Sequence, residues 1–564
     1  MKNASLVAML LSATPAWAAP APVSVVEAAA RRIDGASLMR HIRVLASDRF
    51  EGRAPGTEGE RLTLAYLQQQ FIDLGLAPGN PDGSYLQKVP LARVRSTPTL
   101  RYRAEQGAAV DLRFPDDFVA WSSQEGPVLD IAAAPLVFVG YGVSAPEYGW
   151  DDYKGVDLRG KMLLMLINDP PVTLPGEPAR LDPMMFDGNA MTYYGRWTYK
   201  YEMAAKLGAA GALIVHETTP AGYPYDVVRT TWGRENFSIQ NDGTPPILPA
   251  FPGWLELGRA KQLLRSAGHD FDTLKQAALS RAFTPMPLGL TASAGADNVW
   301  QRLDSYNVVA RIEGADPRLK HETVIYSAHW DHFGLDDTLP GPRSQQIFHG
   351  ARDNASGVAA LLEVAKAYRA LPHPPKRSIL FLITTAEERG LLGAQYYARH
   401  PLYPLAKTLI DINVDGLNMW GRTRDVEIAG YGKSDADDIV TRQARLQGRV
   451  ARPHSHPEFG SFYRSDHFEF AKVGVPVVYL SVGRDFIGQA AGFGKEKIER
   501  FTARDYHKVS DVVGPDWDSA GAVDDARLIF QIGYDVANGA RYPQWKAGAE
   551  FKAVRDAMLP GAGQ

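Results

Sequence analysis

Five residues with side chains that could bind zinc occur in order along the C-terminal half of the chain. Each lies just after an apolar run or near the start of a predicted helix. Imidazole nitrogens and carboxylate oxygens are zinc ligands, and about four ligands surround each ion. Two ions that share one bridging carboxylate need five protein ligands. The sequence offers such a set: His329, Asp353, Glu388, Asp415 and His507.

A spare carboxylate stands beside this set. Glu387 directly precedes Glu388, and adjacent residues at the end of a strand point in different directions. Glu388 can then face a metal ion while Glu387 faces the substrate. Glu387 would take a proton from the attacking water and deliver it to the leaving amine. The pattern therefore indicates a two-zinc hydrolase site with Glu387 as its catalytic base.

Three further side chains are candidates for supporting roles. Asp331 lies two residues after His329, on the same side of an extended segment. We expect its carboxylate to accept the second imidazole N–H and fix the tautomer, and we count it with the catalytic residues. His332 is expected to support the ligands rather than bind metal. Tyr463 could donate a hydrogen bond to the tetrahedral oxyanion, although ordinary aromatic packing explains it equally well.

Each signal alone has an ordinary structural explanation. A His-x-Asp pair is more often a surface or core pair, and adjacent glutamates are usually solvated helix surface. The stretch 353–357 could be a simple helix cap made by Asn354 or Ser356. The order of the motifs and their repeated position at the ends of elements favour the metal site.

The elements that would position these residues alternate between strands and helices. Strands are predicted at residues 308–312, 323–327, 378–384, 408–414 and 475–480. Helices are predicted at 358–368, from about 391, and near 524–538. This alternation indicates α/β layers with a mostly parallel sheet. In such sheets, sites form at the C-terminal ends of the strands.

The pattern of apolar runs and turn residues changes between residues 97 and 296. Short β-like runs are separated there by Pro, Gly, Asp and Tyr, and no clustered metal-binding set stands out. We expect a β-rich, non-catalytic domain, inserted into a discontinuous domain of residues 30–96 and 297–546. One continuous large domain is the alternative. Residues 547–564 are predicted to be a C-terminal tail.

Composition is typical of a soluble globular protein of two or three domains, with 564 residues, 45% hydrophobic and 22% charged. The net charge of −3 gives no electrostatic case for binding nucleic acid or an anionic membrane. The chain has no cysteine, which excludes disulfides and a lipoprotein anchor.

The first residues resemble a secretory signal. Lys2 precedes a short apolar run at 6–11, and Ala16-Trp17-Ala18 has the form of a cleavage site. The run is too short to span a bilayer, and no other run is long enough. A disordered or membrane-anchoring N-terminus is the alternative. We expect an exported bacterial protein, periplasmic or secreted, with the signal cleaved near Ala18.

Together the motifs resemble those of the co-catalytic di-zinc exopeptidases, which include bacterial leucyl-type aminopeptidases and the glutamate carboxypeptidase II group. The resemblance covers roughly residues 36–91 and 305–538, and segments 137–142 and 161–169 look like an inserted protease-associated domain. The motifs that carry it are His329-Trp330-Asp331, Asp353-Asn354-Ala355-Ser356-Gly357, Glu387-Glu388, Asn413-Val414-Asp415, Ser465-Asp466-His467 and Tyr506-His507.

The resemblance implies a three-layer α/β/α phosphorylase/hydrolase-like fold and two Zn²⁺ ions per chain. It implies that Asp353 bridges both ions. His329 and Asp415 would complete one site, and Glu388 and His507 the other.

Three positions depart from the pattern of many relatives. Arg352 stands where an acidic residue is common, and it would either form a salt bridge near the ligands or face outward. His349 replaces a frequent Asn. Residues after His507 lack the common Thr-Pro.

These observations predict a zinc aminopeptidase that removes N-terminal residues from peptides. The choice of an aminopeptidase rests mainly on the resemblance. A carboxypeptidase or dipeptidase with the same metals is the first alternative, and it would need arginines to clamp a substrate carboxylate. The candidates for that clamp are Arg352, Arg389, Arg464 and Arg484. A one-zinc glutaminyl cyclase and a non-catalytic binding protein are further alternatives. The sequence leaves the preferred residue, oligomeric state and native metal open.

Overall fold

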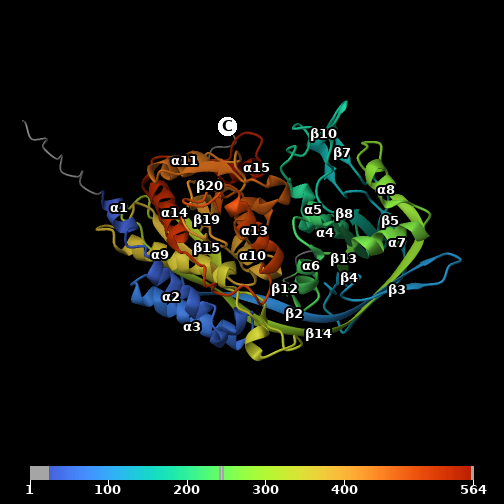
Figure 1. Cartoon of the computed structure of the whole chain (residues 1–564), viewed down its shortest axis with the longest axis horizontal. Coiled ribbons are helices and arrows are strands. Elements are labelled where there is room, and N and C mark those ends of the chain that lie inside the picture. The colour runs from blue at the N-terminus through green and yellow to red at the C-terminus, as the bar shows by residue number, and fades with distance from the viewer. Residues whose placement is uncertain (1–23, 241–242, 244–246, 560–564) are drawn as a thin grey trace, which may run out of the picture.

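The computed structural model describes residues 24–240, 243 and 247–559. The chain forms two parts that lie side by side, joined along one edge by two long strands (Figure 1). The predicted signal segment, residues 1–18, lies outside the described residues. Within the described ranges, no helix has the length and apolar character needed to cross a membrane.

Parallel strands form the centre of the sheet in the first part. They are β18 (Ser378–Thr384), β15 (Thr323–His329), β19 (Thr408–Asn413) and β22 (Val477–Ser481). β14 (Met286–Ile312) pairs antiparallel with β18, and β20 (Asp425–Ile428) pairs antiparallel with β22. The expected mostly parallel sheet is confirmed at its centre and becomes mixed at both sides.

Helices cover both faces of this sheet. Every residue of β15 is buried, and alternate residues enter different cores: Val324 and Tyr326 on one face, Ile325 on the other. The first core includes α2 (Gly35–Leu45), α9 (Gly357–Arg369) and α14 (Ala520–Asn538). The second includes α10 (Leu392–Arg399) and α12 (His467–Lys472). Strands buried on both faces read as continuous apolar runs, which is why the sequence located them closely. The α/β/α layering is confirmed.

The inserted part continues the same sheet. Its strands β5 (Val128–Phe138), β8 (Met162–Leu166), β11 (Gly211–His216) and β13 (Phe251–Glu256) are parallel, with β4 (Phe118–Ala120) antiparallel at the edge. Helices pack on this sheet: α4 (Trp197–Lys206), α6 (Tyr225–Trp232), α7 (Leu257–Ser266) and α8 (Phe271–Ala277). The inserted part is therefore α/β in character, whereas the sequence suggested a β-rich domain.

Two strands run through the predicted domain boundaries. β2 (Leu86–Ala104) and β14 pair continuously from Leu86↔Val308 to Leu290↔Ala104. The expected boundaries at 96 and 297 fall inside this pair, so the two parts share one sheet and no linker separates them. Both strands alternate buried and exposed residues over much of their length, which lets one face stay packed across the junction.

The predicted C-terminal tail is wrong as far as residue 559, because that segment is folded onto the first part. It contains α15 (Lys552–Met558), whose Arg555 is fully buried. The Arg555 guanidinium donates hydrogen bonds to the carbonyl oxygens of Leu405 (3.0 Å) and Thr408 (2.9 Å). Just before this segment, Trp545 Nε1 donates to the Gly474 carbonyl oxygen at 2.9 Å. The segment is short and weakly periodic, and its packing depends on these distant carbonyl groups.

A buried histidine in the inserted part should make stability depend on acid pH. His216 is 3% exposed among Tyr223, Tyr225 and Trp254, and burial lowers its pKa from 6.5 to about 4. In the unfolded chain this imidazole becomes protonated as the pH falls below about 6.5, whereas in the folded chain it stays neutral down to about pH 4. The folded state therefore keeps its full free energy of unfolding above pH 6.5. Between pH 6.5 and pH 4 that free energy falls by up to about 3 kcal/mol.

Urea unfolding at pH 7 and pH 4.5 tests this expectation. His216→Gln should reduce the loss of unfolding free energy between the two pH values. The matched change at the exposed His321 should leave the loss as in the wild type. An unchanged loss in His216→Gln would show that this imidazole does not contribute.

Candidate active site

The predicted ligands meet at one edge of the sheet. His329 is the last residue of β15, Asp415 follows β19, and Glu388 lies in the turn after β18. Asp353 lies in the turn before α9, and His507 follows α13 (Phe493–Arg504). Because parallel strands end at the same edge, residues far apart in sequence converge there.

The two carboxylate oxygens of Asp353 face different partners. On one side, His329 Nε2 lies 3.2 Å from Asp353 Oδ1 and 3.5 Å from Asp415 Oδ1. On the other side, His507 Nε2 lies 3.3 Å from Asp353 Oδ2 and 3.0 Å from Glu388 Oε2. The five side chains thus form two groups that share Asp353, as two metal sites with one bridging carboxylate require.

The chemistry of these groups fits metal cations. Nitrogen and oxygen donors converge in a buried site. Within the described chain, no Lys or Arg lies within 4.0 Å of the carboxylates of Asp353, Asp415 and Glu388. Buried carboxylates need a compensating positive charge. Burial alone would raise the pKa of Asp353, but contacts with His329 and His507 hold it well below its usual range. The buried His329 Nε2 has no hydrogen-bond partner among the described residues and points into the group.

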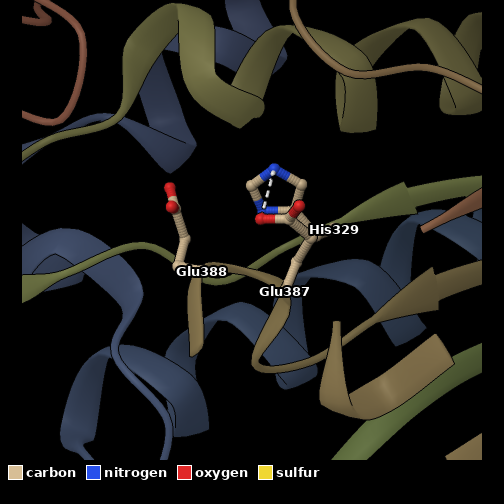
Figure 2. Close-up of side chains that lie close together, drawn as sticks. All are labelled: His329, Glu387 and Glu388. Atoms are coloured by element: carbon tan, nitrogen blue, oxygen red, sulfur yellow. Dashed lines mark ion pairs between the residues drawn. The ribbon is translucent and has the colours of Figure 1, made fainter. Parts of the chain in front are cut away.

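The adjacent glutamates point in different directions, as expected. Glu387 Oε2 lies 3.8 Å from His329 Nε2, and Glu388 stands apart from this pair (Figure 2). Glu388 instead contacts His507 and, at 2.5 Å, His332 Nδ1. Burial raises the pKa of Glu387 well above its usual range, opposed by His329 and reinforced by Asp415. Glu387 is therefore a carboxylate beside the ligand groups, in position to exchange a proton.

Asp331 supports the site through different atoms from those expected. His329 Nδ1 lies 3.1 Å from the backbone carbonyl oxygen of Asp331 and 3.8 Å from its carboxylate. The backbone oxygen, rather than the carboxylate, is thus the hydrogen-bond acceptor that can fix the tautomer. The carboxylate Oδ1 accepts the backbone N–H of Glu387 at 3.0 Å. Asp331 consequently positions both His329 and Glu387.

Comparison with protein families identifies the catalytic part. Residues 307–530 match the model of Peptidase family M28. We refer to residues 307–530 as the M28 domain after this match. The match begins within β14 and ends within α14, so it includes all five predicted ligands and Glu387.

Known relatives of this chain include fungal vacuolar membrane proteases. That of Aspergillus clavatus is 26% identical over 208 residues, covering 35% of this chain and 18% of the relative. That of Saccharomyces cerevisiae is 32% identical over 155 residues, covering 26% and 14%. The chain thus spans less than a fifth of the length of these relatives.

Among solved structures, an aminopeptidase from Aneurinibacillus sp. strain AM-1 has a TM-score of 0.52 with this chain. The sequences are 18% identical, and the match covers 92% of this chain and 97% of the other. The likeness is therefore one of fold, and it extends beyond the M28 domain into the inserted part.

A buried arginine that the sequence did not single out fastens the loops of the M28 domain. Arg53 is 1% exposed. Its guanidinium donates to the carbonyl oxygens of Trp330 (2.8 Å), Leu45 (2.7 Å), His349 (2.7 Å) and Gly350 (2.9 Å). Trp330 follows His329 directly, and His349 and Gly350 directly precede the turn that carries Asp353. Because the acceptors are backbone carbonyl groups, no spacing of residue types in the sequence predicts these hydrogen bonds.

Asp511 is a second support that was missed. Its carboxylate accepts the backbone N–H groups of Asp353 and Arg352, each at 3.0 Å. Asp511 lies four residues after His507, so one segment holds both a ligand and the turn that carries the shared carboxylate. Because the donors are backbone N–H groups of a distant turn, the sequence did not predict this contact.

The departures from the family pattern lie beside the ligand groups rather than in them. Arg352 packs over Phe501 and Trp420, with its guanidinium carbon 4.5 Å and 5.3 Å from the ring centroids. No carboxylate of the described chain lies within 4.0 Å of it, so the salt bridge, one of the two alternatives for Arg352, is not formed. His349 Nε2 lies 2.9 Å from Asp48 Oδ1.

Tyr463 lies in the wall of the site, but its hydroxyl faces another partner. The hydroxyl oxygen lies 3.0 Å from both carboxylate oxygens of Glu550, to which it donates. This contact argues against an oxyanion role, which stays a prediction. Tyr506 also lines the site and stacks on His507, with ring centroids 3.7 Å apart.

A cavity of about 780 Å³ adjoins the ligand groups. The M28 domain and the inserted part both contribute to its walls, so the inserted part borders the candidate active site. The M28 side includes Glu387, Glu388 and His507, and the inserted side includes Trp197, Tyr223 and Trp232. Cavities of this size hold small ligands.

Replacing Arg53 should weaken both the fold and the metal site. Arg53→Leu removes the donors of four hydrogen bonds and leaves buried carbonyl groups unpaired, at a cost of about 3 kcal/mol or more. Chemical denaturation should report this loss, and metal titration should report weaker binding. Arg49→Leu changes an exposed neighbour and is the matched control. Equal stability of the two variants would contradict this account of Arg53.

Proposed function

We propose that the chain is a zinc-dependent aminopeptidase with two metal sites. The observation that carries the proposal is the position of Asp353, whose two oxygens face separate groups of ligands. His329 and Asp415 would hold one ion with Asp353, and Glu388 and His507 the other. When bound, zinc supplies Lewis-acid polarisation of the scissile carbonyl and lowers the pKa of the attacking water.

The chain's own residues perform the remaining tasks. Glu387 lies 3.8 Å from His329 Nε2. There its carboxylate takes a proton from water and returns it to the leaving amine. Asp331 holds Glu387 in place through the backbone N–H. The M28 match and the aminopeptidase from Aneurinibacillus support peptide bonds as the substrate.

Peptides blocked at either end test the proposal. The purified, zinc-loaded protein is incubated with free, N-acetylated and C-amidated peptides, and the products are followed by mass spectrometry. Loss of single residues from free N-termini, abolished by acetylation and by a chelator, is expected. Cleavage that survives acetylation but needs a free C-terminus would replace the proposal with a carboxypeptidase.

We further propose that the protein is exported after cleavage near Ala18. The positively charged start, the apolar run at 6–11 and the Ala16-Trp17-Ala18 segment support this. N-terminal sequencing of the protein from a periplasmic or culture fraction should begin close to Ala19. A protein that keeps residues 1–18 and stays in the cell would refute export.

A further inference from the structure

The cavity beside the metal ligands contains positive charge that the described chain does not neutralise. Three partly buried arginines line it: Arg196, Arg389 and Arg464. No carboxylate of the described residues lies within 4.0 Å of their guanidinium nitrogens. Each also has at least one buried guanidinium nitrogen without a hydrogen-bond partner in that part of the chain.

Arg389 has a structural role. Its Nη1 donates to the carbonyl oxygens of Thr231 (3.3 Å) and Glu235 (2.9 Å). Both acceptors belong to the inserted part, so Arg389 ties that part to the M28 domain. This contact explains the position of Arg389 without a ligand.

Arg196 has no comparable partner. It lies just before α4, and within the described ranges its side chain makes no hydrogen bond. Its guanidinium carbon lies 5.0 Å from the centroid of the Trp197 ring, which supports the group from one side. Burial, together with the nearby Arg464, lowers the pKa of Arg196 to about 10. Arg196 still carries its charge at neutral pH.

Arg464 contributes a second guanidinium group to the lining of the same cavity. Its Nη2 donates to the carbonyl oxygen of Ala221 at 2.6 Å, and its carbon lies 4.9 Å from the Tyr223 ring centroid. These contacts fix the group while its buried Nε remains without a partner. Two like charges near each other, away from bulk water, favour an anion between them.

The acidic residues of the cavity wall away from the metal ligands are already engaged. Glu469 pairs with Lys472 at 2.7 Å, and Glu125 pairs with Arg302 at 2.7 Å. The Glu202 carboxylate accepts the hydroxyl of Tyr193 at 2.7 Å, and burial raises its pKa. The anion for Arg196 and Arg464 must therefore come from outside the described chain.

We infer that Arg196, together with Arg464, binds the free C-terminal carboxylate of a short peptide. The inference rests on the proposed function, in which the scissile bond of that peptide lies at the ligand groups of the same cavity. A planar guanidinium fits a carboxylate through two parallel hydrogen bonds. A cavity of about 780 Å³ limits the ligand to short peptides. An acidic side chain offers the same chemistry and is the other possible source.

Binding to a hydrolysis-deficient protein tests the inference. Zinc-loaded Glu387→Gln is titrated calorimetrically with Leu-Gly-Gly, with its C-terminal amide, and with Leu-Asp-Gly-amide. We expect the free acid to bind about ten- to a hundredfold more tightly than the amide, because one charge-assisted interaction is lost. Adding Arg196→Gln should remove this difference, whereas adding the exposed Arg159→Gln should preserve it.

Three results would overturn the inference. These are equal binding of acid and amide, a preference that survives Arg196→Gln, and a preference for Leu-Asp-Gly-amide that Arg196→Gln removes. The last result would assign the arginines to an acidic side chain. Arg196→Lys keeps the charge without the planar fork, so it should retain part of the preference and serves if Arg196→Gln does not fold.

The proposed function has its own readout. If the wild-type holoenzyme cleaves no peptide, the aminopeptidase proposal fails, and the calorimetric comparison still decides whether Arg196 binds a carboxylate. If the enzyme cleaves acids and amides equally well and binds them equally, only the inference about Arg196 fails.

Discussion

Glu387→Gln should lower kcat by about a hundred- to ten-thousandfold while the protein keeps both metal ions. A glutamine cannot take a proton from water or return it to the leaving amine, and general acid–base catalysis contributes a factor of this size. The carboxylate is not one of the paired ligands around Asp353, so metal content should not change. Steady-state kinetics and elemental analysis of the same preparation measure the two quantities.

The adjacent residue provides the matched control. Glu388→Gln makes the same chemical change one position along the chain, but Glu388 Oε2 lies 3.0 Å from His507 Nε2 in a ligand group. This variant should lose metal, and excess zinc should restore part of its activity. Zinc should not rescue Glu387→Gln. If both variants lose metal equally, the separation of base and ligand is incorrect.

Asp353→Ala should remove both metal sites at once. Asp353 is the residue shared by the two groups, with one oxygen on each side. Metal content should fall from two equivalents toward none, and kcat/KM should fall about a thousandfold or more, since Lewis-acid stabilisation is worth several kcal/mol. Metal analysis after dialysis, followed by peptide kinetics, measures both effects.

Stability provides a second measure of the same change. A chelator should lower the Tm of the wild type, because bound metal stabilises the folded state. It should leave the Tm of Asp353→Ala unchanged. Asp505→Asn alters an aspartate two residues before His507 that belongs to neither group, and it should behave like the wild type. A variant of Asp353 that retains one full equivalent would show that the carboxylate is not shared.

The sequence predicted most of the site because its residues follow strands. A strand buried on both faces, such as β15, is evident as an apolar run, and the residue that ends it lies at the sheet edge. His329, Asp415 and Glu388 were located in this way. The position of Glu387 directly before Glu388 then suggested it as the catalytic base.

Features that depend on distant backbone atoms could not be predicted in this way. Arg53 donates to carbonyl groups on other segments, and nothing in its local sequence marks it. Spacing placed Asp331 near His329 but could not tell its backbone oxygen from its carboxylate. Arg196 lines the same cavity as Glu388 and His507 only through the packing of the inserted part, in which no sequence motif marks it.

The pairing of β2 with β14 also describes how such a chain can gain or lose a large segment. Ser96 and Asn298 are cross-strand partners, and their side-chain oxygens lie 2.7 Å apart. The inserted part thus occupies the place of a hairpin turn. The entropic cost of closing a loop rises only slowly with its length. A two-residue turn between these partners would keep the remaining β2–β14 register. The same deletion would remove β12 (Asn236–Ile239), which pairs with β2 at residues 91–94, and would leave β2 there as an edge strand.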